Sequence, residues 1–249
     1  MNDFFMLGEN VIFPNPMGTF SGKHLLVLFL SIIFAIWMVR DYKKSENKAK
    51  YRRIFAIIIL LVVLSRHVIE FFTGQYTVHR LPLHLCTIGA ILKLYDAYVE
   101  NDYSKEVLFV LTLPAAAIAN VFPDWTHQPL INFNTGQQFL FHALLVNYVL
   151  MRYCAGEIKP SIKKMWMPVS ALIAMLILLM PINRTLGTNF FFFNTYSPNS
   201  PLEIIYLQMG SSLYLPTFLF IKIMLGFLIY AILGICRKIL YKSTSLRID

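Results

Sequence analysis

Cys86 and His142 are the two residues whose types suggest covalent chemistry in this chain. A thiol becomes a nucleophile when a nearby histidine takes its proton. His84 is a poor base for Cys86, because two helical positions lie about 200° apart around the axis. His142 belongs to a different hydrophobic segment at a similar depth and could reach the thiol. A lone cysteine in such a segment is also a common packing residue, so both interpretations stay open.

Other polar residues fall at the same predicted level. Arg66 and Glu70 are spaced i,i+4, so they share one helix face and could pair, and His67 could join them. Ionisable groups inside a membrane are costly and usually face a cavity or a partner. The candidate substrate-binding residues are therefore Arg66, Glu70, His84, Asn183 and Asn189. A purely structural Arg66–Glu70 pair near the membrane interface fits the same spacing.

Membrane-spanning helices are the elements that must position these residues. Hydrophobic residues make up 57% of the 249 positions and charged residues 14%, whereas soluble domains carry about a quarter charged residues. The mean hydropathy is +0.60. The apolar blocks have the length of bilayer-crossing helices, and lipid requires every backbone group to be hydrogen-bonded internally. We expect one all-α transmembrane bundle over 1–249, with about seven spans at 20–39, 54–72, 83–99, 105–122, 138–155, 165–182 and 213–236.

The basic residues predict the orientation of this bundle. Of the 22 Lys and Arg residues, 16 fall in alternate connections and in the tail, where the last four are Arg237, Lys238, Lys242 and Arg247. The positive-inside rule then places the N-terminus outside and the C-terminus in the cytoplasm, which requires an odd number of spans. All six histidines map to the outer half. The net charge of +9 is therefore a topology signal, and no nucleic-acid partner is expected.

Four short motifs resemble those of one protein family. The stretch Leu81-Pro82-Leu83-His84-Leu85-Cys86 resembles the LPLHLC signature of the YwaF-type family of bacterial integral membrane proteins. Matching pieces follow the family order at Ser21–His24, Gln138–His142 and Asn183–Phe190. That family looks related to a eukaryotic transmembrane acyltransferase that moves fatty acyl chains on ether phospholipids. The resemblance implies that Cys86 and His142 form the catalytic pair.

These observations favour a lipid acyltransferase or acyl-ester hydrolase near the outer leaflet. Cys86 would attack an ester carbonyl after His142 takes its proton. Asn189 or the backbone at the start of the third span could stabilise the oxyanion, and Arg66 could hold a lipid phosphate. We expect membrane lipids as partners, no cofactor, and a multi-pass location in the cell membrane. The oligomeric state is left open.

Two other functions fit parts of the pattern. A transporter or ligand-binding protein would use the same polar region as an outward-facing vestibule, with Arg66 meeting an anion and Glu70 or His142 coupling protons. The lack of an internal repeat weakens that interpretation. An extracytoplasmic metal site could use the six histidines with Glu70 and Asp124, but the chain has no HExxH motif and no ligand set defined by spacing. We therefore predict no metal.

Overall fold

The chain folds into helices. The computed structural model describes residues 3–6, 12–198 and 200–245, without the side chains of 234–245, so the side chains of the basic tail and of Cys236 lie outside the description. Within these ranges all regular structure is helical, as expected. The main helices are α1 (Gly22–Lys44), α2 (Lys48–Phe72), α3 (Leu85–Tyr98), α4 (Asp102–Val107), α5 (Leu113–Val121), α6 (Phe133–Cys154), α7 (Trp166–Leu186) and α8 (Pro201–Ser245). Short turns of helix are η1 (Asp3–Phe5), η2 (Val78–Arg80), the π-helix η3 (Leu108–Thr112), η4 (Ile162–Lys164) and η5 (Phe190–Phe192).

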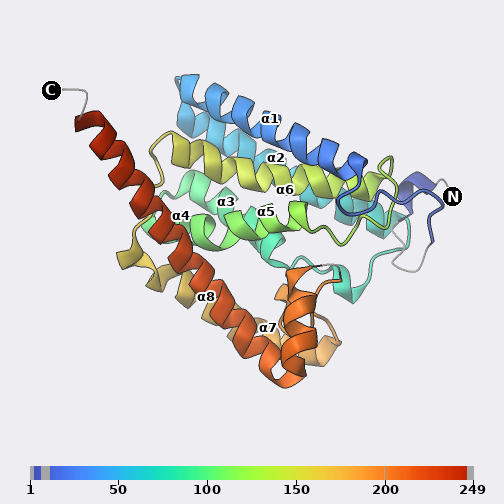
Figure 1. Cartoon of the computed structure of the whole chain (residues 1–249). Coiled ribbons are helices and arrows are strands. Elements are labelled where there is room, and N and C mark those ends of the chain that lie inside the picture. The colour runs from blue at the N-terminus through green and yellow to red at the C-terminus, as the bar shows by residue number, and fades with distance from the viewer. Residues whose placement is uncertain (1–2, 7–11, 199, 246–249) are drawn as a thin grey trace.

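In the described part of the chain the main helices form seven consecutive rods, because α4, η3 and α5 join into one (Figure 1). Each rod coincides with one predicted span. We call the end of the bundle where α1 begins the His24 end, and the opposite end, where α6 finishes, the Arg152 end. Successive rods alternate in direction between these two ends. All six histidines lie toward the His24 end, which agrees with the sequence prediction.

Five of the seven rods are long and apolar enough to cross a membrane: α1, α2, the α4–η3–α5 rod, the η4–α7 segment and α8 up to Leu233. The helix α3 has only 14 residues, about 21 Å, and is shorter than the hydrocarbon core. The helix α6 is too polar, but most of its side chains are buried against other helices. A helix enclosed mostly by protein does not need a fully apolar surface, so α6 completes the bundle with little exposed surface.

Several helices extend beyond the predicted spans, among them α6 and α8 at their first residues. The helix α6 begins at Phe133 rather than 138, because Asn132 caps it by accepting hydrogen bonds from the backbone of Asn134 and Thr135. Its first residues are polar but buried, so hydropathy alone does not reveal them. The last rod begins at Pro201 rather than 213 and bends at Gly210, whose φ of 71° lies in the left-handed region that favours glycine.

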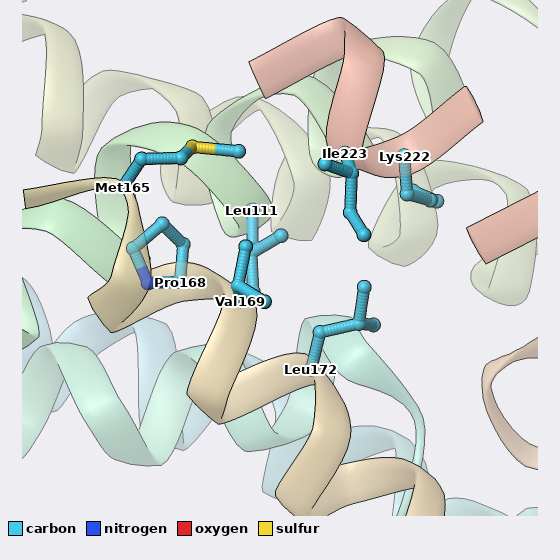
Figure 2. Close-up of a pocket in the computed structure, with 7 residues that line it drawn as sticks. All are labelled: Leu111, Met165, Pro168, Val169, Leu172, Lys222 and Ile223. Carbon is cyan, nitrogen blue, oxygen red and sulfur yellow. The ribbon is translucent and has the colours of Figure 1, made fainter. Parts of the chain in front are cut away.

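The helices α7 and α8 lie beside the bundle formed by α1 to α6, and α8 crosses it obliquely (Figure 1). A small crevice separates the start of α7 from η3 and the middle of α8 (Figure 2). Its lining is apolar apart from Lys222: Leu111, Met165, Pro168, Val169, Leu172 and Ile223. A lysine in the middle of an apolar helix therefore borders this crevice.

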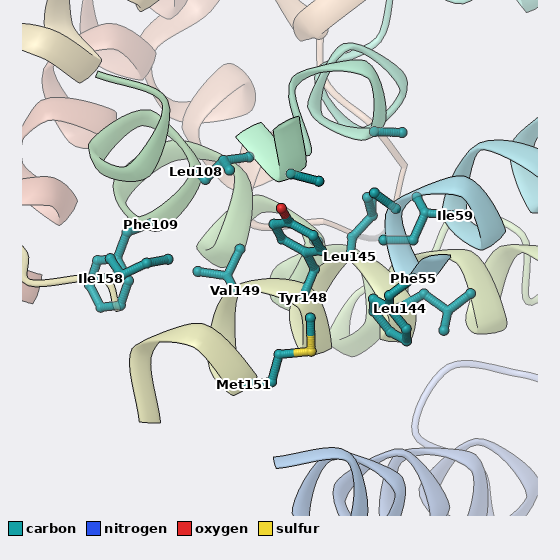
Figure 3. Packing of buried hydrophobic residues seen from close by; sticks show 14 of the residues in the cluster. Phe55, Ile59, Leu108, Phe109, Leu144, Leu145, Tyr148, Val149, Met151 and Ile158 are labelled. Atoms are coloured by element: carbon teal, nitrogen blue, oxygen red, sulfur yellow. The ribbon is translucent and has the colours of Figure 1, made fainter. Parts of the chain in front are cut away.

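The main hydrophobic core surrounds α6, which contacts α1, α2, α3 and α5. Leu144, Leu145, Tyr148, Val149 and Met151 of α6 pack between α2 and the η3 region (Figure 3). Such close packing in lipid fixes the relative positions of the helices by dispersion contacts. The core thus holds α3 and α6, which carry Cys86 and His142, as one unit.

Candidate functional site

Cys86 lies in the first turn of α3, directly after a tight entry segment. His84 is the residue at the helix N-cap, with an extended backbone. Its ring packs edge-on against Phe190, with centroids 5.1 Å apart. The Cys86 side chain is partly buried and packs against the main core. Gly89 and Lys93 follow at i+3 and i+7, so all three residues share one face of α3.

His142 is held in an orientation that suits a general base. Its Nδ1 lies 2.8 Å from the backbone oxygen of Gln138. A carbonyl only accepts, so Nδ1 carries the hydrogen and Nε2 has the free lone pair. The ring of Trp125 stacks on the imidazole at 5.1 Å with an interplanar angle of 17°, and His142 is only 6% exposed. His142 therefore has a fixed ring and a nitrogen able to take a proton.

The depth of Cys86 and His142 is set by an ion pair elsewhere on the same helices. Asp96 of α3 pairs with Arg152 of α6. Cys86 precedes Asp96 by ten residues, and His142 precedes Arg152 by ten, about 15 Å along each helix. Since α3 and α6 run in the same direction, the thiol and the imidazole lie at the same level. Both are also close enough to Lys93 to be affected by its charge.

No hydrogen bond joins Cys86 to His142 among the residues that the structure describes. Catalytic hydrogen bonds are often long in unliganded proteins and shorten when substrate binds. The thiol and the imidazole thus lie at the same level and near Lys93, without a hydrogen bond between them.

Arg66 and Glu70 form the predicted pair near the end of α2. Arg66 Nε donates to Glu70 Oε1 at 2.7 Å. His67 Nδ1 lies 3.6 Å from Oε2, and Arg80 Nε lies 3.8 Å from Oε1. The Glu70 side chain is completely buried. Three potential cations therefore surround one buried carboxylate at the His24 end.

Asn183 and Asn189 organise the loop that follows α7. Asn183 accepts a hydrogen bond from Phe190 N at 2.8 Å and donates one to Phe190 O at 3.0 Å. Asn189 accepts from Thr195 N and donates to Thr195 O. These bonds fix the backbone on either side of the Phe190 ring, which contacts His84. The amide of Asn189 is thus engaged within its own loop.

Several buried side-chain atoms at the His24 end have no hydrogen-bond partner within the described part of the chain. They are both ring nitrogens of His67, Glu70 Oε2, Asn120 Oδ1, Trp125 Nε1, Asn134 Oδ1 and Gln137 Oε1. Leaving such a group unpaired costs about 1–3 kcal/mol, and in native proteins water or a ligand commonly satisfies it. In the same described ranges, no three His, Cys, Asp or Glu side chains gather closely enough to hold a metal ion. The His24 end thus offers polar contacts to a bound molecule.

Comparison with known families adds to this geometry. A family model described as the TMEM164 family matches residues 19–235. The chain belongs to the TMEM164 family. The part shared with the TMEM164 family runs from just before α1 into α8, so it contains Cys86, His142 and every helix that positions them. It is a family of membrane proteins, which agrees with the apolar helices. No curated protein and no solved structure matches the chain.

A charged network at the Arg152 end of this TMEM164-family chain was missed by the sequence analysis, which placed the polar chemistry at the other end. Arg152, which is unexposed, contacts Asp96 and lies 3.0 Å from Glu157. Arg52 contacts Glu100 and lies 3.0 Å from the same Glu157 oxygen. Asp96 interrupts the third predicted span and Arg152 lies near the end of the fifth. Opposite charges at the same predicted depth in these two spans could have predicted the Asp96–Arg152 pair.

Proposed function

We propose that the protein is a lipid acyltransferase or acyl-ester hydrolase that uses Cys86 as nucleophile and His142 as base. The single observation that carries this proposal is the common level of the two residues, fixed by the Asp96–Arg152 pair, with His142 presenting Nε2. The resemblance of the Leu81–Cys86 motif to YwaF-type proteins, and through them to a phospholipid acyltransferase, supports the same assignment.

The reaction proceeds by transfer of an acyl group through the thiol. His142 Nε2 takes the proton of Cys86 while Sγ attacks the carbonyl carbon of a lipid ester. The tetrahedral intermediate collapses, the ester C–O bond breaks, and the leaving alcohol receives the proton from His142. A second alcohol then attacks the thioester, loses its proton to His142 and expels the thiolate, which is reprotonated. Water in place of the second alcohol gives hydrolysis.

The lipid phosphate would bind beside Arg66. Within the described residues, the Nε–H is the only N–H of Arg66 that donates a hydrogen bond to Glu70, and a guanidinium has five N–H donors in all. We place the His24 end at the outer leaflet, as the distribution of basic residues predicts. The acyl chains would then lie among the apolar helices, which exclude water from the thioester.

The test is acyl transfer by the purified full-length chain in phospholipid vesicles. Labelled fatty acyl chains are followed from one lipid class to another or to free acid. Cys86→Ala should abolish transfer, and His142→Gln should lower its rate by roughly 10²-fold or more. Cys154→Ala is the matched control, because Cys154 is an exposed free thiol at the opposite end of the bundle. Unchanged transfer by a folded Cys86→Ala chain would rule out the proposal.

Transport is the second candidate function, and the buried charges favour it in one respect. Glu70, Lys93, Asp96 and Arg152 are all unexposed within the helices, and buried ionisable residues in membrane proteins often line ion or substrate pathways. A transporter would keep its activity in Cys86→Ala, because it forms no thioester. Uptake of an anionic solute by vesicles that contain Cys86→Ala, without any lipid acyl turnover by the wild-type chain, would select this function.

A further inference from the structure

Among the residues that the structure describes, Lys93 is a buried cation with no acidic partner. Its side chain has no exposed surface, although an unpaired ammonium in the interior is costly. Lys93 Nζ donates to Thr112 Oγ1 at 3.1 Å and lies 3.4 Å from the backbone oxygen of Gly89. No carboxylate lies at ion-pair distance from Nζ among the described residues. Hydrogen bonds alone therefore hold this group in place.

The nearest acid on the same face of α3 is already engaged. Asp96 accepts hydrogen bonds from Ser104 at 2.7 Å, from Tyr148 at 3.0 Å and from Arg152. Helical side chains point toward the N-terminus of their helix, and Lys93 follows this rule by reaching back one turn to Gly89. Its charge is therefore directed away from Asp96 and toward the turn that carries Cys86.

Gly89 provides the room for this arrangement. A Cβ added at Gly89 would stand 3.3 Å from Thr112 Cγ2 and 3.6 Å from Lys93 Nζ. The partner Thr112 ends the π-helix η3, and its hydroxyl also lies 2.8 Å from the oxygen of Leu108. Such π-helical turns occur often at functional sites. A glycine, a π-helix and a buried lysine thus meet one helical turn from Cys86.

Charges from three elements act on Cys86. They are Lys93 in α3, Lys222 in α8 and Asp124 in the α5–α6 connection. Lys222 places Nζ 5.3 Å from the centre of the Phe218 ring and borders the crevice of Figure 2. The charge of Lys93 also acts on His142 in α6, as does that of Arg66 in α2. Lys93 is thus the cation common to both members of the proposed pair.

We propose that Lys93 is a positioning residue that stabilises the thiolate of Cys86 electrostatically. The thiolate in turn supplies the negative charge that Lys93 lacks. This role rests on Cys86 being the nucleophile of the proposed function, but it concerns the ionisation of the thiol and can be measured without any acyl substrate.

The experiment follows alkylation of Cys86 by iodoacetamide as a function of pH. The full-length chain carries Cys154→Ser and Cys236→Ser, so that Cys86 is its remaining thiol, and is studied in lipid nanodiscs. Lys93→Gln keeps a polar group that can contact Thr112 but removes the charge. We expect the alkylation midpoint to move upward by about one pH unit and the rate at neutral pH to fall about tenfold. Lys93→Met should behave in the same way, and Lys93→Arg should restore most of the rate.

The controls distinguish the effect of the Lys93 charge from misfolding of the variants and from the effect of Lys222. Thermal unfolding shows that each variant is folded, and Lys222→Met should change the midpoint less than Lys93→Gln. An unchanged midpoint in folded Lys93→Gln would overturn the proposal, as would failure of the wild-type thiol to react between pH 6 and 10. If the wild-type chain transfers no acyl groups but its alkylation midpoint still shifts in Lys93→Gln, the acyltransferase function is refuted. The effect of Lys93 on the Cys86 thiol then still holds.

Discussion

Asp96 and Arg152 form an ion pair in which neither side chain is exposed. The pair joins α3 to α6, and it lies ten residues beyond Cys86 on one helix and ten residues beyond His142 on the other. A structural contact at the Arg152 end therefore sets the level of the proposed catalytic groups at the His24 end. The charged network that the sequence analysis did not anticipate thus bears on the proposed function.

Removing this pair should destabilise the fold and impair the proposed reaction together. Asp96→Asn leaves Arg152 without its closest buried counter-charge, and breaking a buried pair costs about 3 kcal/mol. We expect a lower unfolding temperature and reduced acyl transfer. Asp102→Asn is the matched control, because Asp102 forms an exposed ion pair with Lys164 at 2.7 Å and exposed pairs contribute little. Equal losses of stability in the two variants would contradict this account.

Glu157 makes stability depend on acidic pH. Burial opposes ionisation of this carboxyl, but hydrogen bonds from Tyr42 and Arg152 and the charges of Arg152 and Arg52 outweigh it, so the pKa of Glu157 lies below its ordinary value. The carboxylate therefore stabilises the fold above its unfolded-state pKa, and this contribution is lost as pH falls through the lower folded-state pKa.

The unfolding temperature in detergent, measured from pH 6 down to pH 3, should accordingly fall. In Glu157→Gln the same curve should start lower and be flatter, because the titrating group is gone while Arg52 and Arg152 have lost a partner. A slope equal to that of the wild-type chain would show that other carboxyls dominate the acid response.

Gly89→Ala should disturb the contact between α3 and η3. The new methyl group would press on Thr112 at 3.3 Å, and overpacking costs typically about 1–3 kcal/mol. Gly136→Ala in α6 is the comparison, since nothing lies within 4 Å of its added Cβ and alanine favours a helix by roughly 0.5–1 kcal/mol. Thermal unfolding should show opposite signs for the two substitutions. If Gly89→Ala raised the unfolding temperature, the Thr112 side chain would have moved aside at little cost, which contradicts this prediction.

Local features of this fold could be predicted from the sequence. The apolar blocks correspond to the seven rods, and the i,i+4 spacing predicted the Arg66–Glu70 pair. Both depend on neighbours in the chain, which periodicity reports directly. The grouping of the histidines at one end followed from the same alternation of spans.

Other features depend on contacts between distant segments. The start of α6 was placed too late, because hydropathy detects lipid-facing surface and not polar residues buried by other helices. The Asp96–Arg152 pair joins residues 56 positions apart, and the role of Gly89 appears only when η3 lies against it. The spacing of residues within one segment cannot predict such contacts between distant segments.

The most direct test of the central claim is a search for an acyl thioester on Cys86. The purified chain is incubated with phospholipid vesicles, quenched in acid and digested, and the peptide that contains Cys86 is examined by mass spectrometry. We predict a fatty acyl mass increase on this peptide that neutral hydroxylamine removes and that His142→Gln strongly reduces. Lipid acyl turnover by the same sample with no adduct on Cys86, and equal turnover by Cys86→Ala, would contradict the account.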